Sequence, residues 1–331
     1  MIIESRAFAR AGLLGNPSDG YFGKTISIIV RNFSASISLY ETPELRIEET
    51  EVDTNRFRNI YQLVDQIKLT GYYGGTRLIK AGIKKFWEHC ETNSIRLPNR
   101  NFTIRYRSSI PRQVGLAGSS AIVTATVRAL MKFYEVDIPK HILATLILKA
   151  ETEELNITAG LQDRVIQVYE GCVFMDFEKE HLKNTGFGKY ESIEPSLMPK
   201  LYLAYKVDLS KVSGNVLNNI RERYDKGEAL VHDTLAELAQ LAEDGKKAIL
   251  TGDHHTLNLL MNKNFDLRCK IMNISDSNME FVRIARECGA SAKFSGSGGA
   301  IIGMYEDDEM LQRLIVNLRR INARVIKPII N

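Results

Sequence analysis

The sequence predicts an α+β protein built from two domains. With 331 residues, the chain is longer than a single hydrophobic core usually supports, so two domains that share a cleft are expected. Apolar residues make up 44% of the chain and charged residues 25%, values that are typical of a globular protein without long disordered segments. In the second half, strand patterns alternate with paired helices, an order that favours a sheet with helices on one face.

The first half begins with a strongly alternating segment. Between residues 25 and 40, apolar Phe33, Ala35, Ile37 and Leu39 alternate with serines, which predicts a half-buried strand. A similar alternation predicts a strand at 102–106. Helical spacing at 55–70 and 76–90 is interrupted by the glycine-rich residues 71–75, which should break the helix. Further helices are expected at 119–134 and 139–154, and a strand at 171–177.

The change of domain is expected where the segment PSLMP, residues 195–199, precedes an apolar run. We therefore divide the chain into a domain of residues 1–195 and a domain of residues 196–331. The elements expected after this boundary are strands at 201–208, 299–304 and 323–329 and helices at 215–224, 228–245, 253–263, 277–288 and 308–319.

Composition disfavours several classes of protein. Lys and Arg total 44 against 40 for Asp and Glu, and this balance of +4 without a basic stripe does not indicate a nucleic-acid partner. No window approaches ~18 consecutive apolar residues, so no membrane span and a cytoplasmic location are expected. The cysteines lie too far apart for a zinc site or a disulfide framework, and reduced thiols are expected at Cys90, Cys172, Cys269 and Cys288.

Three glycine-rich segments carry the functional signal. In PRQVGLAGSSAIV, residues 111–123, Gly115 and Gly118 lead into Ser119 and Ser120 at a predicted helix start. A helix start exposes backbone N–H groups and the positive end of the helix dipole, so such a segment can hold an anion. No lysine follows the glycines, which excludes the common nucleotide-binding loop. Taken alone, the segment fits a helix packed closely against a neighbour equally well.

The other two segments flank this one in the chain. RAGLLGNPSDGYFGKT, residues 10–25, gathers polar side chains that can bind sugar hydroxyls, although its central residues are also ordinary turn formers. AKFSGSGGAIIG, residues 292–303, fits a tight turn or a ligand loop. The polar side chains of the first segment are Asn16, Ser18, Asp19, Tyr21 and Lys24.

Acidic residues between these segments supply a further chemical requirement. KAETEELNITAGLQDRV contains Glu151, Glu153 and Glu154 at a helix end and then Asp163. Phosphoryl transfer from ATP needs a cation held by oxygen ligands and a residue that orients or deprotonates the attacking hydroxyl. Asp163 is a candidate for the second role. The glutamates can equally be solvated or paired with basic side chains, and Arg164 can be a simple salt-bridge partner.

In this order, the segments resemble the GHMP kinases, the superfamily of galactokinase, homoserine kinase, mevalonate kinase and phosphomevalonate kinase. The matching elements are Arg10 followed by Gly15 and NPSD, then PRQVGLAGSSA, and finally SGSGGA. Galactokinases have Glu-His where this chain has Asn16 and Pro17. Within the superfamily, GLLGNPSDGYFGKTIS, GYYGGTRL, AGLQDRVIQVYEG and ASAKFSGSGGA resemble segments of plant glucuronokinases over nearly the whole chain.

The resemblance implies both a fold and an activity. It implies an N-terminal domain like ribosomal protein S5 domain 2, a C-terminal ferredoxin-like domain and an active site between them. The implied reaction is the transfer of a phosphoryl group from ATP to the anomeric hydroxyl of D-glucuronate, with Mg²⁺ as cofactor. We expect a monomer or a homodimer, between which the sequence does not choose.

The resemblance also implies roles for individual residues. Asp163 would face the acceptor hydroxyl with Arg10 beside it, and Ser120 and Glu151 would hold Mg²⁺, with Glu153 and Glu154 left open as alternative ligands. The residues expected to bind ATP are Gly115, Leu116, Ala117, Gly118, Ser119, Ser120 and Ala121. Those assigned to the substrate are Asn16, Asp19, Tyr21, Gly296 and Gly298.

A uronate substrate adds one requirement, because its carboxylate needs a cation or a set of N–H donors. Lys24, Arg77 and Arg164 are the candidates, and the sequence does not choose among them. The alternatives are a related kinase acting on a heptose phosphate or galacturonate, a sugar or ATP sensor without turnover, and an RNA-binding module.

Overall fold

The computed structural model describes residues 2–48, 74–157, 159–206 and 218–331. The helix expected at 55–70 therefore lies outside the described residues. Contacts divide the chain into two units. Unit 1 contains Met1–Phe8, Phe33–Ile110 and Gly118–Ala159, and unit 2 contains Ala9–Asn32, Pro111–Ala117 and Gly160–Asn331. This division follows contacts rather than chain order, and the boundary between residues 195 and 196 stays a prediction.

Two long strands, β1 (Ile2–Leu14) and β2 (Lys24–Glu41), contribute residues to both units. In unit 1, the end of β2 pairs antiparallel with β4 (Phe102–Ser108), with Ala35 opposite Ser108, and β3 (Arg46–Ile47) pairs with β4 in parallel. Ala35, Ile37 and Leu39 are buried while the serines between them are half-buried. The alternation at 25–40 therefore predicted both the strand and its inward face.

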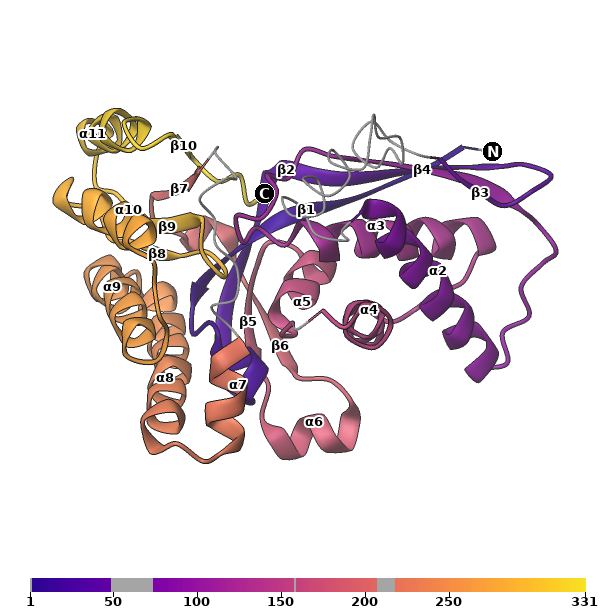
Figure 1. The fold of residues 1–331 in the computed structure, drawn as a ribbon, viewed down its shortest axis with the longest axis horizontal. Helices are drawn as coiled ribbons and strands as arrows, with labels where there is room; N and C mark the ends of the chain where they lie inside the picture. Colours follow the sequence, from indigo (N-terminus) through magenta and orange to yellow (C-terminus); the bar gives the residue numbers. More distant parts are fainter. Residues whose placement is uncertain (1, 49–73, 158, 207–217) are drawn as a thin grey trace, which may run out of the picture. The chain divides into compact units, whose positions relative to one another are not determined.

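The described residues of unit 1 form the helices α2 (Gly75–Thr92), α3 (Gly118–Tyr134) and α4 (Lys140–Leu155), each at the place that the sequence predicts. The three helices pack against one another and lie on the same side of β2 and β4 (Figure 1). Their inward faces are apolar, as the burial of Leu78, Phe86 and Phe133 shows.

Unit 2 contains the first half of β2, which pairs antiparallel with β5 (Cys172–Asp176), and β5 pairs in turn with β6 (Lys189–Ile193). The strand at 171–177 is thus confirmed. A short 3₁₀ helix, η1 (Ser18–Tyr21), and α5 (Gln162–Tyr169) complete this part, with α6 (Lys179–Thr185) between β5 and β6.

The rest of unit 2 is built on an antiparallel sheet of order β10-β7-β9-β8. Its strands are β7 (Leu201–Lys206), β8 (Lys293–Phe294), β9 (Ala300–Met304) and β10 (Ala323–Ile326). Together with the helices after β7 and before β10, this order is the split βαβ arrangement of ferredoxin-like domains. Aromatic and aliphatic residues of the sheet, including Tyr202 and Phe294, pack against Phe281 and Leu314 of the helices.

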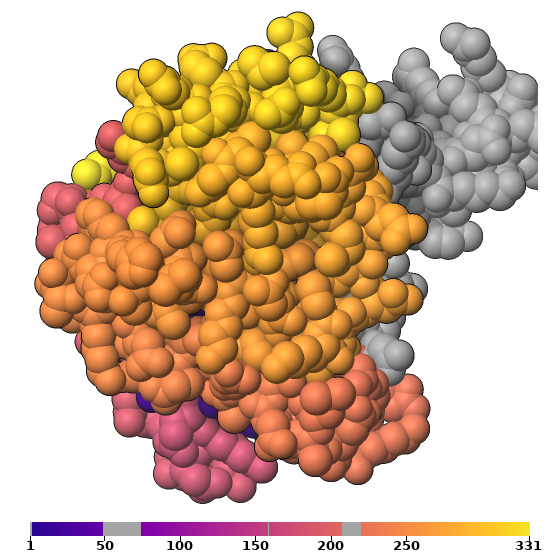
Figure 2. All heavy atoms as spheres, turned by 90° about the vertical axis from the view of Figure 1, so that its left-hand side faces the viewer, coloured from indigo at the N-terminus to yellow at the C-terminus, as the bar shows by residue number. Residues whose placement is uncertain are grey.

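The helices of this part are α7 (Asn218–Asp225), α8 (Ala229–Thr251), α9 (His254–Ile271), α10 (Asp276–Glu287) and α11 (Asp308–Arg319). Helices α8 and α9 pack together, as do α10 and α11, and Figure 2 shows these residues gathered on one face. The predicted end of α9 at residue 263 was wrong. Phe265, Leu267 and Ile271 are buried, so the helix continues until its apolar face ends.

The sequence reasoning did not find β1, α5 or the short strands β3, β6 and β8. In β1 the buried positions carry small or polar residues such as Ser5, Ala7 and Arg10 in place of large β-branched ones, so the strand gives a weak hydrophobic signal. Across the described ranges, no helix is both long and apolar enough to cross a bilayer.

Candidate active site

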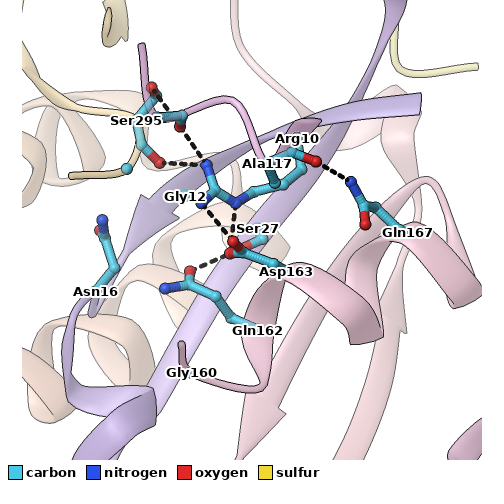
Figure 3. Close-up of polar contacts among 12 residues, drawn as sticks. Arg10, Gly12, Asn16, Ser27, Ala117, Gly160, Gln162, Asp163, Gln167 and Ser295 are labelled. Carbon is cyan, nitrogen blue, oxygen red and sulfur yellow. Dashed lines mark hydrogen bonds and ion pairs between the residues drawn. The ribbon is translucent and has the colours of Figure 1, made fainter. Parts of the chain in front are cut away.

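Arg10 on β1 is the centre of a buried polar cluster in unit 2. Its Nε and Nη2 atoms donate to the two carboxylate oxygens of Asp163, at 2.6 and 2.8 Å. Its Nη1 atom donates to the backbone oxygens of Gly115, at 2.6 Å, and Ser295, at 3.2 Å (Figure 3). One guanidinium therefore joins the acidic residue to the second and third glycine-rich segments, with the bidentate geometry that makes such pairs strong.

Helix α5 supplies three polar side chains to this cluster. Asp163 lies in its first turn, next to Gln162, whose Nε2 donates to Asp19 Oδ1 at 2.9 Å. One and a half turns later, Gln167 donates to the backbone oxygen of Ala117 at 2.9 Å. The helix is thus bound to the 3₁₀ helix η1 through Gln162 and to the loop 111–117 through Gln167, and Figure 3 shows the second of these bonds.

Asp163 is held as a carboxylate. Burial opposes its ionisation, since its side chain is only 17% exposed, but the charges of Arg10 and Arg164 and the hydrogen bonds from Arg10 outweigh burial. The pKa of Asp163 is therefore lowered from its ordinary value of 3.8. Arg164 Nη1 lies 3.6 Å from Asp163 Oδ2, so the carboxylate has two cationic neighbours.

The pKa of Asp19 is shifted in the opposite direction. Burial and the nearby charge of Asp163 raise its pKa from 3.8 to about 6, although the backbone N–H of Gln162 and the charges of Arg10 and Arg164 act against this. Two carboxyl groups in one cluster therefore have pKa values on opposite sides of the ordinary value. This separation is typical of functional sites.

Glycine is required beside Asp19. A Cβ atom at Gly160 would lie 1.9 Å from Asp19 Oδ2, and Arg164 donates to the backbone oxygen of Gly160 at 2.7 Å. Gly160 stands in the small-residue turn that the sequence places before Asp163. Its role is to let this turn approach the carboxylate.

The second and third glycine-rich segments pack backbone against backbone. A Cβ atom at Gly296 would lie 2.2 Å from the oxygen of Gly115, and Gly115 itself has a φ of +69°. Gly298 has a φ of +132° and lies beside Asn278. Close packing therefore explains why these positions are glycine, and the substrate role assigned to Gly296 and Gly298 stays a prediction.

Lys293 binds the first glycine-rich segment through uncharged backbone and amide oxygens. Its ammonium group, wholly buried, donates to Gly12 O at 2.7 Å, to Asn16 Oδ1 at 2.7 Å and to Phe294 O at 2.8 Å. These three acceptors use all of its N–H bonds. Lys293 thereby holds Asn16 in place, and Asn264 fixes the same turn by accepting from the backbone N–H of Gly15 at 2.7 Å.

Arg268 adds a further buried cation. It is 1% exposed and donates to the backbone oxygen of Gly296 at 2.9 Å, and burial lowers its pKa to about 10. Burial also lowers the pKa of Lys293 well below its ordinary value, with Arg268 and Arg10 adding to the effect.

The predicted metal residues lie in unit 1. Ser120, in the first turn of α3, and Glu151, in the last turns of α4, are both fully buried on helices that pack against each other. Glu153 pairs with Lys85 at 2.7 Å, and Glu154 pairs with Lys84 at 2.6 Å and with Lys85. Of the three glutamates, Glu151 is therefore the one whose side chain is fully buried.

Comparison with known proteins shows which family this chain resembles. The model of the GHMP kinase N-terminal domain matches residues 77–171, and that of the C-terminal domain matches residues 246–323. A probable glucuronokinase 2 of Arabidopsis thaliana is 42% identical over 335 residues, which cover 99% of this chain and 91% of the relative. This chain belongs to the GHMP kinase family. Glucuronokinase 1 of the same plant is 44% identical over 91% of this chain and 84% of its own length.

Solved structures agree with this GHMP kinase in fold. The galactokinase of Lactococcus lactis, complexed with galactose, has a TM-score of 0.75 at 13% identity and covers 99% of this chain and 93% of its own. The mevalonate kinase of Methanococcus jannaschii has a TM-score of 0.70 at 20% identity, covering 99% and 98%. The two-domain fold implied by the sequence segments is thereby confirmed.

The donor atoms of this GHMP kinase fit the magnesium that the family implies. Within the described ranges no three His, Cys, Asp or Glu side chains gather as a metal cage. Mg²⁺ in kinases needs only one or two protein oxygens, because phosphates and water supply the other ligands. A buried hydroxyl at Ser120 and a buried carboxylate at Glu151 are donors of this kind.

The structure brings most of the predicted residues of this GHMP kinase together in unit 2. Arg10, Asp163 and Asp19 form one cluster. The loop of Gly115, Leu116 and Ala117 contacts this cluster through three hydrogen bonds. The Arg10 side chain donates to Gly115 O, the Arg10 backbone N–H donates to Leu116 O at 3.3 Å, and Gln167 donates to Ala117 O. The remaining predicted ATP-binding residues belong to α3 in unit 1, namely Gly118, Ser119, Ser120 and Ala121.

Sequence reasoning gave no role to Gln162, Gln167, Lys293 or Arg268, although the first three stand inside segments that it singled out. A glutamine beside the key aspartate and a lysine before the third glycine-rich loop were visible signals. Their partners lie up to 281 residues away, as in the bond from Lys293 to Gly12, so no spacing in the sequence reveals them.

Proposed function

We propose that this chain is an ATP-dependent kinase that phosphorylates the anomeric hydroxyl of D-glucuronate, giving glucuronate 1-phosphate. Two relatives named as glucuronokinases, at 42% and 44% identity, support the substrate. The observation that carries the chemistry is the buried pair of Asp163 and Arg10, placed against two glycine-rich loops. A buried carboxylate beside such loops is what transfer to an alcohol requires.

In this proposal Asp163 faces the hydroxyl on C1. The hydroxyl oxygen attacks the γ-phosphorus of ATP, the bond from that phosphorus to the β–γ bridging oxygen breaks, and ADP leaves. Because the pKa of Asp163 is lowered, its carboxylate is a weak base, so it orients the hydroxyl first and takes the proton late in the transfer. The proton becomes acidic as the new bond to phosphorus forms.

Arg10 acts by positioning. Two of its nitrogens are bound to Asp163, and the third already donates to Gly115 O and Ser295 O. Its charge keeps Asp163 ionised, and its bonds fix the two loops relative to that carboxylate. These contacts leave little of the guanidinium free for the phosphoryl group.

The phosphates are assigned to the loop from Gly115 to Ala117 and to the helix start that continues it through Ser120, because a helix start presents the positive end of its dipole to an anion. Bound Mg²⁺ would be held by Ser120 and Glu151 and would neutralise charge on the phosphate oxygens. Asp19, Asn16 and Tyr21 are assigned to the sugar hydroxyls. Magnesium as the metal, a cytoplasmic location and a monomeric or homodimeric state stay predictions.

The test of function is a panel of sugars assayed for ADP release, with ³¹P NMR of the product. We expect a kcat/KM for glucuronate at least ~10²-fold above that for glucose, and a phosphorus signal on C1. Equal values for the two sugars would reject the uronate substrate and leave the kinase. A better rate with galacturonate or a heptose phosphate would select another kinase, and ATP binding without ADP release would select a sensor.

A pH titration tests the sugar-binding role of Asp19. Its pKa of about 6 means that the carboxyl group becomes ionised between pH 5 and 7, and a carboxylate accepts hydrogen bonds from sugar hydroxyls better than the neutral acid does. We therefore expect KM for the sugar to fall as pH rises through about 6. The Asp19→Asn variant should have a higher KM without this inflection. An inflection of the same size in the variant would contradict the assignment.

A further inference from the structure

Helix α7 places an arginine against the turn that we assign to the sugar. Arg221 donates from Nη2 to the backbone oxygen of Gly20 at 2.5 Å, and its guanidinium carbon lies 4.4 Å from the ring centre of Tyr21. The ring of Tyr224, from the same helix, lies 4.8 Å from that of Tyr21. Residues about 200 positions apart thus meet at the η1 turn, next to Asp19.

Arg221 retains unused donors. Its side chain is 45% exposed, and within the described ranges its one ion pair is a long contact of 3.9 Å to Asp225, which is itself 61% exposed. An exposed pair at this distance contributes little. Nε and Nη1 therefore remain available for another anion, while Nη2 and the Tyr21 ring keep the guanidinium oriented.

Two of the three basic residues expected from the sequence are committed elsewhere. Lys24 pairs with Glu243 at 2.9 Å and with Asp176 at 3.6 Å. Arg164 is 3% exposed and is bound to Gly160 O and near Asp163. Arg77 is exposed on α2 in unit 1.

The rest of α7 holds Arg221 in position. Tyr224 stacks on His232 at 4.1 Å with an angle of 17° between the rings. Arg223 donates to Glu228 at 2.7 Å and to Ile271 O, the last residue of α9, at 2.8 Å. The helix is therefore tied to α8 and α9, and the guanidinium of Arg221 is presented from a supported element rather than from a free loop.

We propose that Arg221 binds the carboxylate of the uronic acid and so determines specificity for an acidic sugar over a neutral one. The inference rests on the proposed function, in which the η1 turn holds sugar hydroxyls. A guanidinium presents N–H donors in the planar fork that a carboxylate matches, and its stacking on Tyr21 sets the plane of that fork. A neutral sugar gains nothing from this group.

The test compares Arg221→Leu with Lys226→Leu. Lys226 directly follows the last residue of α7, carries the same charge, is 70% exposed and pairs with Glu222, so its loss controls for the general electrostatic change. We expect Arg221→Leu to raise KM for glucuronate by about 10- to 100-fold, with KM for ATP and kcat/KM for glucose unchanged. Arg221→Lys should recover part of the loss, because it restores a point charge without the fork.

Three results would overturn the proposal. An unchanged KM for glucuronate in Arg221→Leu would remove its role while the kinase function stands, provided that the wild type makes the 1-phosphate. An equal loss with glucuronate and glucose would mean that Arg221 only supports the turn. A wild-type enzyme that treats both sugars alike would reject the uronate substrate and this inference together. Thermal melting of each variant verifies that the exposed substitution leaves the fold intact.

Discussion

Asp163→Asn is expected to lower kcat by at least ~10²-fold while the protein stays folded. Asparagine has the same size and keeps one acceptor for the guanidinium of Arg10, but it can neither take a proton nor orient a hydroxyl as strongly as a carboxylate does. The measurement is the steady-state release of ADP at saturating ATP and sugar. A loss of this size corresponds to the effect of one general base.

The control for this variant is Asp176→Asn. Asp176 ends strand β5 and lies 3.6 Å from Lys24 Nζ, outside the cluster around Arg10. Its substitution changes the same charge and should leave kcat within about twofold, as expected for a partly exposed ion pair. If folded Asp163→Asn turns over at a nearly normal rate, Asp163 is not the residue that faces the hydroxyl.

Arg10→Met is expected to abolish measurable activity and to lower the free energy of unfolding by about 3 kcal/mol. The substitution leaves Asp163 buried without its bidentate partner and removes the donors bound to Gly115 O and Ser295 O. The pKa of Asp163 is lowered in the folded wild type because of Arg10, so the ionised carboxylate stabilises the fold above pH ~4, the pKa of Asp in the unfolded chain. This stabilisation is lost as the pH falls below that value. The variant should lack this pH-dependent contribution.

A double variant separates charge from packing. In Arg10→Met with Asp163→Asn, no ionised carboxylate is left without its bidentate partner, so part of the stability lost in Arg10→Met should return while activity stays absent. Urea denaturation of the four proteins gives the coupling energy. Additive losses would show that the two side chains do not act as a pair.

The order of the segments and their resemblance to the GHMP kinases predicted Asp163 as the acid that faces the hydroxyl, and this role stays a prediction. Arg10, Gly115 and Asp163 stand in three segments whose composition suits phosphate and alcohol chemistry, and the structure joins them around one guanidinium. Only the structure shows that Glu151 is fully buried while Glu153 and Glu154 pair with lysines, because burial depends on helix packing, and the metal ligand stays a prediction. A helix end rich in glutamate looks the same in sequence whichever side chain is buried.

The same contrast holds for the carboxylate-binding group. Lys24 and Arg164 stand inside or beside the recognised segments, yet both are engaged with other residues, whereas Arg221 lies in a helix that carried no motif. Only the contact between α7 and the η1 turn makes it a candidate.

The sequence by itself determined the α+β architecture and most of its helices and strands, because these depend on local backbone geometry and side-chain type. Tertiary structure alone decided which groups are ionised, paired or available. The pKa of Asp19, the space at Gly160 and the three bonds of Lys293 arise from atoms far apart in the chain, and burial is a property of the folded packing.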